Sequence, residues 1–181
     1  MKIIETSIPE VKVFEPKLFG DDRGFFFESF NQQTFQNAIG SEISFVQDNH
    51  SSSKKNVLRG LHYQIKQPQG KLVRVARGAI FDVAVDLRKS SPTLGQWVGA
   101  EISEDNHRQI WVPAGFGHGF LALSDEVEVL YKTTDYYAPE HERCVLWKDP
   151  QIGIEWPFDA EPILSEKDRQ GVAFNEADLF Q

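Results

Sequence analysis

Residues 80–87 read Ile-Phe-Asp-Val-Ala-Val-Asp-Leu. Side chains alternate between the two faces of a β-strand, and one face of this stretch carries only apolar residues, namely Phe81, Val83, Val85 and Leu87. The other face holds Asp82, Ala84 and Asp86. This pattern is typical of a strand with one packed face and one polar face. It therefore predicts an antiparallel β-sheet whose apolar face is covered.

Similar short apolar runs, bounded by Gly, Pro, Asn and Asp, lie on both sides of this stretch, and sustained helical periodicity is rare. The segments that we expect as strands are 11–19, 25–30, 44–49, 57–64, 72–77, 80–87, 96–102, 109–112, 119–123 and 127–133. Turn signals such as Arg77-Gly78 and Ser124-Asp125 separate them. Many short strands at this spacing predict a mostly β protein, built as a sandwich or a barrel.

Two short helices should lie at the periphery. Asn31 can cap a helix that runs to Ile39, and Gly40 is placed to end it. A second helix can begin at Ser165, with Glu166 in its first turn. The chain has 181 residues with no internal repeat and no low-complexity linker, so we expect a single domain over residues 1–181.

Charge is unevenly distributed along the chain. The net charge of −8 argues against a protein that coats nucleic acid or an anionic membrane. Residues 54–89 nevertheless hold nine Lys and Arg against Asp82 and Asp86, a net charge of +7. This segment is either a local anion site or a solvated face. No apolar run approaches the roughly 20 residues of a membrane helix, and the first residues lack a signal-peptide pattern, which predicts a cytoplasmic protein.

Motifs for several chemistries are missing. The chain has no phosphate-binding loop, no dinucleotide fingerprint and no G-x-S-x-G elbow. Its one cysteine, Cys144, excludes an intramolecular disulfide and follows Arg143 in an unremarkable setting. His62 is followed on its strand face by Gln64, and His118 lies in a glycine-rich segment that resembles a tight turn. Two histidines without a neighbouring third ligand are a poor metal site, so we expect no metal.

Four polar residues remain as candidates, each with two interpretations. His62 is either a general base or a histidine satisfied beside a strand. Lys71 and Arg59 either hold an anion or are solvated at a strand edge. Tyr131 shares a strand face with Val127 and Val129, so its ring points inward, either into the core or into a cavity.

Seven segments, taken in order, resemble one family. They are Asp22-Arg23-Gly24, 47–51 (QDNHS), 58–64 (LRGLHYQ), 69–73 (QGKLV), 113–120 (PAGFGHGF), Tyr131-Lys132-Thr133 through Tyr137, and 164–168 (LSEKD). In this combination the chain resembles the dTDP-4-dehydrorhamnose 3,5-epimerases, which belong to the cupin β-barrel class. The resemblance spans nearly the whole chain and implies a cupin-like antiparallel barrel or jelly roll with a few short peripheral helices.

The resemblance also implies a reaction and its catalytic residues. The family inverts C3 and C5 of dTDP-4-dehydro-6-deoxy-D-glucose, both carbons being α to the C4 ketone, and needs no cofactor and no metal. By the match, His62 is the base, Asp168 its partner, and Tyr131 the acid that returns a proton. Lys71 would stabilise the enolate oxygen, since an ammonium offsets developing negative charge.

Substrate-binding positions carry over in the same way. They are Arg23, Glu28, Gln47, Asn49, Arg59, His118, Tyr137, Glu142 and Lys167. The resemblance further implies a homodimer. Arg59 and His62 have opposite strand parity although both are implicated in one site, so either a bulge near Gly60 re-aims one of them or Arg59 reaches in from a neighbouring subunit.

Two alternatives stay open on the sequence alone. A relative with the same fold can epimerise only C3 or only C5 of another dTDP-4-keto-6-deoxy sugar, because that distinction depends on the shape of the pocket. A metal-binding cupin is the other alternative. The +7 segment contains Arg59, His62 and Lys71, which favours a local cationic pocket for an anionic substrate.

Overall fold

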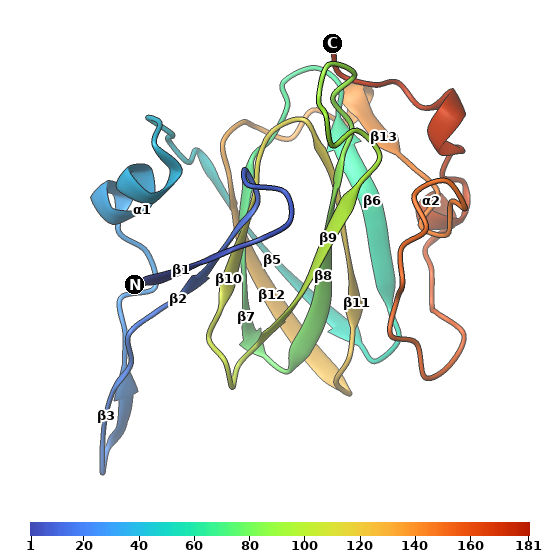
Figure 1. Ribbon diagram of the computed structural model, residues 1–181. Helices are drawn as coiled ribbons and strands as arrows, with labels where there is room; N and C mark the ends of the chain where they lie inside the picture. The colour runs from blue at the N-terminus through green and yellow to red at the C-terminus, as the bar shows by residue number, and fades with distance from the viewer.

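The computed structural model describes all 181 residues (Figure 1). Its elements confirm a mostly β protein with short helices. In chain order they are β1 (Lys2–Glu5), β2 (Lys12–Glu15), β3 (Phe19–Asp21), β4 (Gly24–Phe26), α1 (Gln32–Ile39), β5 (Gln47–Lys54), β6 (Leu58–Gln64), β7 (Lys71–Arg77), β8 (Ala79–Asp86), β9 (Trp97–Ser103), β10 (Gln109–Val112), β11 (Phe116–Ala122), β12 (Glu126–Thr133), β13 (Glu142–Cys144) and α2 (Glu166–Arg169), with 3₁₀ turns at Pro139–His141 and Phe174–Glu176. None of the helices has the length and apolar character that a membrane crossing requires.

Two antiparallel sheets make the body of the molecule (Figure 1). One has the strand order β1-β2-β10-β7-β12-β5 and the other has the order β13-β6-β11-β8-β9. The strands β3 and β4 form a separate hairpin. This arrangement confirms the expected antiparallel barrel, and β5 and β13 are the edge strands on which part of the site is built.

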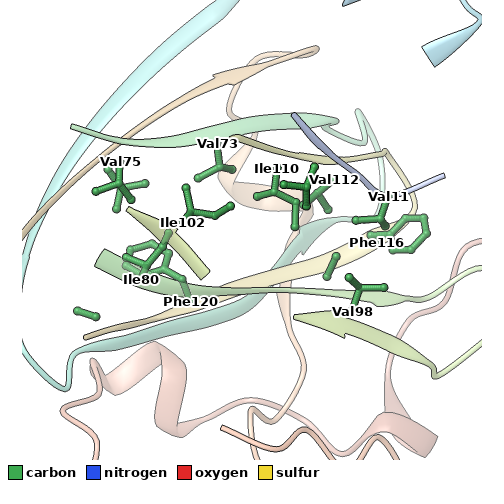
Figure 2. Close-up of a cluster of buried hydrophobic side chains, with 14 of the residues drawn as sticks. Val11, Val73, Val75, Ile80, Val98, Ile102, Ile110, Val112, Phe116 and Phe120 are labelled. Carbon is green, nitrogen blue, oxygen red and sulfur yellow. The ribbon is translucent and has the colours of Figure 1, made fainter. Parts of the chain in front are cut away.

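The main hydrophobic core lies between the two sheets (Figure 2). Val73 and Ile110 contribute from the first sheet, and Ile80 and Phe120 from the second. All four side chains are at most 5% exposed. Burying side chains of this kind contributes about 1.5–3 kcal/mol each, so this core fixes the spacing of the two sheets.

The expected polar face of β8 is in fact buried. Asp82 and Asp86 are fully inaccessible to solvent and point, with Ala84, toward the space between the sheets. The opposite, apolar face packs under the C-terminal segment, including Trp147 and Trp156. The alternation along β8 is as predicted, but both of its faces are covered because the chain after β13 returns across the outside of the second sheet. A buried carboxylate needs partners, and both aspartates have them.

Several strand boundaries differ from the prediction. Residues 11–19 split into β2 and β3, with Pro16 between them. The predicted strand 44–49 shifts to β5, which continues through three serines that carry no apolar pattern. The glycine-rich segment that resembles a tight turn is instead most of β11, a strand buried along its full length. The first helix begins and ends as expected, with Asn31 accepting a hydrogen bond from the Thr34 N–H.

Candidate active site

A cavity of about 310 Å³ opens between the facing sheets. Strands β5, β7 and β12 form one wall, while β6 and β13 form the other. Seven of the predicted site residues line it: Gln47, Asn49, His62, Lys71, Tyr131, Tyr137 and Glu142. Tyr131 therefore faces a cavity, as the resemblance implied. The polar character of β5 also has its reason here, because its inward face borders this cavity instead of the apolar core.

His62 and Asp168 meet at one side of the cavity. His62 Nε2 lies 2.8 Å from Asp168 Oδ1, although the N–H direction at this nitrogen is not aligned with the oxygen. Asp168 is buried and also accepts hydrogen bonds from the Gly60 N–H (3.0 Å) and the Ser165 hydroxyl (2.5 Å). Burial alone would raise the pKa of Asp168, but these three partners together lower it to about 2. The carboxylate is therefore ionised beside the imidazole at neutral pH.

The local sequence explains why Asp168 points this way. Ser165 caps α2, and Asp168 is its third residue, so the two side chains form a capping box. The Ser165 hydroxyl also bonds the Asp168 N–H (3.2 Å). The cap fixes the carboxylate on the side of the helix that faces β6, which is where His62 lies.

Lys71 and Tyr131 supply a cation and a phenol to the same cavity. Burial lowers the pKa of Lys71 to about 8, although the charges of Asp82 and Glu142 act in the opposite direction. Burial raises the pKa of Tyr131, with Arg59 opposing that shift. At neutral pH the lysine is mostly charged and the tyrosine is protonated, so the wall opposite His62 offers a positive charge and a proton donor.

The rim of the cavity is held by a chain of polar contacts. The Tyr137 hydroxyl donates to Glu142 Oε2 (2.7 Å), and Lys167 forms an ion pair with the same carboxylate. The Tyr137 N–H donates to Gln47 Oε1 (3.1 Å). The Tyr137 ring stays 54% exposed, and it presents a flat apolar face at the entrance.

A β-bulge lies between Arg59 and His62 and puts both on one face of β6, although Arg59 is exposed and does not line the cavity. In the pairing of β6 with β11, His118 lies opposite His62 while Phe120 lies opposite Arg59, so β6 has one extra residue. Gly60 and Gly119 make this possible, because a Cβ on Gly60 would lie 2.5 Å from the Gly119 Cα. Arg59 donates to the Ser53 hydroxyl (3.0 Å) and the Ser52 carbonyl (3.1 Å). The bulge, the first of the two explanations, is therefore present within one chain.

His118 lies on β11, directly across from His62, but it has its own carboxylate. Its Nε2 is 3.0 Å from both oxygens of Asp82. Asp82 also acts electrostatically on Lys71. Asp82 had no predicted role in the site, because the strand pattern placed it on a polar face. The structure instead puts it behind two predicted site residues.

Arg23 and Glu28 are not brought to this cavity. Arg23 lies at the turn of the β3–β4 hairpin and pairs with Asp21 of the same turn. Glu28 is exposed and accepts a hydrogen bond from Asn31 (3.2 Å). A second hollow, of about 350 Å³, lies beside His50, Arg74 and Lys132 and includes neither His62 nor Lys71. The predicted roles of Arg23 and Glu28 remain predictions.

Cys144 lies beside His62 but does not line the cavity, and its sequence context did not predict this position. It pairs with His62 in the register of β13 and β6. One ligand atom from each of His62, Cys144 and Asp168 lies within 4.8 Å of the others. This trio comes from three segments far apart in the chain, so no third ligand was evident near the histidines in the sequence.

Comparison with known proteins places the chain in one family. A family model described as dTDP-4-dehydrorhamnose 3,5-epimerase matches residues 5–176. The chain is 63% identical to the dTDP-4-dehydrorhamnose 3,5-epimerase of Pseudomonas aeruginosa over 180 residues, covering 99% of each chain. It is 60% identical to that of Salmonella typhimurium, covering 100% of each. A crystal structure of dTDP-6-deoxy-D-glucose-3,5-epimerase from Legionella pneumophila, in complex with dTDP-4-keto-L-rhamnose, superimposes with a TM-score of 0.97 at 51% identity, over 99% of this chain and 97% of that one.

Proposed function

Because the chain belongs to the dTDP-4-dehydrorhamnose 3,5-epimerase family, we propose that its cavity inverts C3 and C5 of dTDP-4-dehydro-6-deoxy-D-glucose. It is an isomerase, and the product is dTDP-4-dehydro-L-rhamnose. The observation that carries the assignment of roles is the arrangement of the cavity. His62 with Asp168 lies on one wall, while Tyr131 and Lys71 come from the opposite wall.

Inversion at a carbon next to a ketone needs a base on one face and an acid on the other. His62 is the base. With its Nε2 turned toward Asp168, the imidazole has Nδ1 left to accept the proton from C3 or C5. The ionised Asp168 then stabilises the imidazolium. Tyr131 returns a proton from the opposite face, since the raised pKa of its hydroxyl keeps it protonated.

The remaining residues bind the substrate and stabilise its charge. Proton removal moves negative charge to the C4 oxygen, where the Lys71 ammonium offsets it. Arg59 and His118 suit the diphosphate and sugar, and Tyr137 offers its ring to thymine. Gln47, Asn49, Glu142 and Lys167 complete the lining and rim. The positive segment 54–89 is thus read as a cationic pocket within an acidic chain.

We also propose a cytoplasmic homodimer in which Arg23 and Glu28 serve the cavity of the partner subunit. The β3–β4 hairpin stands away from the barrel (Figure 1). It exposes Phe19 at 55%, Phe25 at 61% and Phe26 at 69%, an apolar patch that a second copy would cover.

Mixing two inactive variants tests whether Arg23 acts in the partner's cavity, since a chain with Arg23→Ala keeps its own His62. Random dimers of Arg23→Ala and inactive His62→Asn chains should recover about a quarter of wild-type activity. No recovery would place Arg23 in its own chain's site.

Exchange of protons with solvent tests the reaction itself. Incubation with dTDP-4-dehydro-6-deoxy-D-glucose in D₂O, followed by NMR, should place deuterium at both C3 and C5. Deuterium at one carbon would identify a C3-only or C5-only epimerase, and none at either carbon would contradict the proposal. His62→Asn should abolish exchange at both carbons. Tyr131→Phe should allow exchange but impair inversion, since the variant keeps the base and lacks the acid.

A further inference from the structure

Two side chains of types that bind metals, Cys144 and Asp168, converge on the proposed base, His62. Cys144 lies opposite His62 on the neighbouring strand, and α2 brings Asp168 to both. Their ligand atoms lie within 4.8 Å of one another. Cys144 has no part in the epimerisation described above, so its position next to the base calls for a separate explanation.

The trio offers the nitrogen, sulfur and oxygen ligand types that Zn²⁺ prefers. Bonds of about 2.0–2.3 Å to nitrogen, oxygen and sulfur in a tetrahedron place the ligand atoms roughly 3.3–3.7 Å apart. His62 Nε2 and Asp168 Oδ1, now 2.8 Å apart, need to separate by about half an ångström. The Cys144 sulfur, which lies within 4.8 Å of both ligand atoms, needs to approach them by at most about 1.5 Å. Nε2 is buried and makes no aligned hydrogen bond. An ion between these atoms would satisfy it.

A divalent cation at this site has two anionic ligands available, the Asp168 carboxylate and, once it loses its proton, the Cys144 thiolate. Binding releases one proton from the thiol to solvent, while the imidazole proton moves from Nε2 to Nδ1. The Zn²⁺, carboxylate and thiolate charges then sum to zero, and no oxidant or other reactant is involved.

We propose that His62, Cys144 and Asp168 form an inhibitory site for a thiophilic divalent cation such as Zn²⁺. The bound ion occupies Nε2 and fixes the proton on Nδ1, so His62 can no longer act as a base. Hard cations such as Mg²⁺ should not bind, because they prefer oxygen ligands. The inhibitory effect rests on the proposed function, whereas the binding site itself does not.

Cobalt(II) tests binding without any turnover. Titration of the protein with Co²⁺, in the absence of substrate, should produce the near-ultraviolet charge-transfer band of a thiolate–cobalt bond. Cys144 is the only cysteine, so such a band has one source. Cys144→Ser and Cys144→Ala should lose the band. His50→Ala, which removes an exposed histidine outside the trio, is the control and should keep it. A folded wild-type protein without the band would overturn the proposal.

Inhibition is measured separately. Zn²⁺ should inhibit the wild-type enzyme reversibly, with activity restored by EDTA, and Mg²⁺ should have no effect. Cys144→Ser should retain basal turnover and need at least about tenfold more Zn²⁺ for half-inhibition, since one of three ligands is lost. Equal sensitivity of wild type and both Cys144 variants would overturn the proposal. If turnover were absent altogether, the proposed function would fail while the cobalt band still decided the metal site.

Discussion

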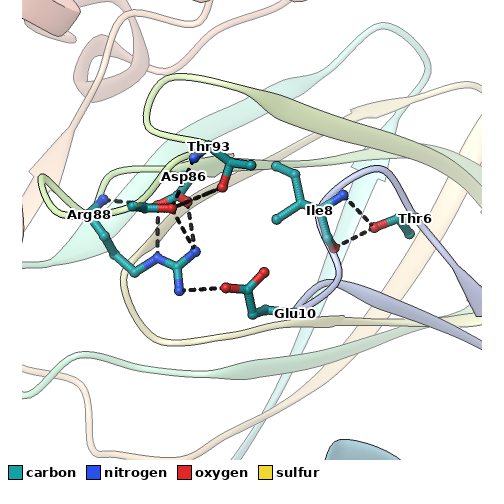
Figure 3. Close-up of polar contacts among 7 residues, drawn as sticks. Thr6, Ile8, Glu10, Asp86, Arg88 and Thr93 are labelled. Carbon is teal, nitrogen blue, oxygen red and sulfur yellow. Dashed lines mark hydrogen bonds and ion pairs between the residues drawn. The ribbon is translucent and has the colours of Figure 1, made fainter.

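Two buried aspartates in this molecule have similar acidity but opposite surroundings. The pKa of Asp86 and that of Asp168 are each lowered to about 2 by hydrogen bonds that outweigh burial. Asp86 accepts from Arg88 Nε (2.9 Å) and a second guanidinium nitrogen (2.7 Å), as well as from the hydroxyls of Ser91 and Thr93 at 2.5 and 2.6 Å (Figure 3).

Asp168 has a less complete set of partners. Its carboxylate accepts hydrogen bonds from the Gly60 N–H and the Ser165 hydroxyl. Its third neighbour is His62 Nε2, whose N–H is poorly aligned with the carboxylate oxygen. In the Asp86 cluster every charged group has a partner, since Arg88 also pairs with Glu10 at 3.1 Å (Figure 3). A saturated network stabilises one position of the chain. The Asp168 network, which is not saturated, borders the cavity and leaves His62 available for proton transfer.

Replacing Asp168 should have the largest effect on turnover. In Asp168→Asn an amide N–H would face His62 Nε2 and favour the tautomer with its proton on Nδ1, which cannot act as a base. We expect kcat to fall about 10²–10⁴-fold, while the free energy of unfolding falls by about 1–3 kcal/mol, since the amide loses the charge-assisted hydrogen bonds of the carboxylate. Steady-state kinetics and urea denaturation measure the two quantities. A large loss of stability with normal kcat would show that Asp168 belongs to the same class as Asp86.

Replacing Asp86 should give the reverse result. Asp86→Asn leaves Arg88 without its main partner, although Glu10 still contacts it, so the expected loss is about 2–3 kcal/mol of unfolding free energy, somewhat below that for a fully buried pair. Turnover per folded molecule should stay within about twofold of wild type, because the cluster has no contact with the cavity. A kcat that fell with unchanged stability would contradict the assignment of this cluster to the scaffold.

The pH dependence should report Lys71, the cation on the cavity wall opposite His62. Its pKa of about 8 means that the ammonium is present below pH 8 and is lost as the pH rises through that value. The kcat/KM should therefore fall about tenfold per pH unit above pH 8. Lys71→Arg provides the control, since a guanidinium stays charged and its remaining activity should lack this alkaline limb. An identical limb in both enzymes would exclude Lys71 as its source.

The sequence predicted this architecture where apolar residues alternate. Strands such as β8 and β12 follow from period-two patterns, and α1 follows from Asn31 and Gly40. The polar strand β5 and the glycine-containing β11 were predicted only in part, within 44–49 and 119–123, because β5 faces a cavity and β11 depends on the close approach of two backbones. Alternation tells which residues share a face, but it does not tell what covers that face.

The site was predictable only in part for a related reason. Ordered motifs identified most of the residues around the cavity, among them His62, Lys71 and Tyr131. The positions of Cys144 beside His62 and of Asp82 beside His118 were not predicted, because they arise from contacts between strands that are distant in the sequence. Such neighbours depend on register, which a single sequence does not contain.

Asp82 is buried like Asp86 but lies close to the catalytic groups like Asp168. Its replacement should have the smallest effect. Its carboxylate is held by His118 alone among side chains, and its charge raises the pKa of Lys71 against burial. Asp82→Asn removes that charge, so the Lys71 pKa should fall further and the alkaline limb of kcat/KM should move below pH 8, by roughly half a unit to one unit. The folded state should survive, since an amide of the same shape can still accept a hydrogen bond from His118.

If the alkaline limb of kcat/KM stayed in place and stability fell as in Asp86→Asn, Asp82 would have a structural role only. If the alkaline limb moved, the buried carboxylate of Asp82 would be shown to control the charge of Lys71 inside the cavity.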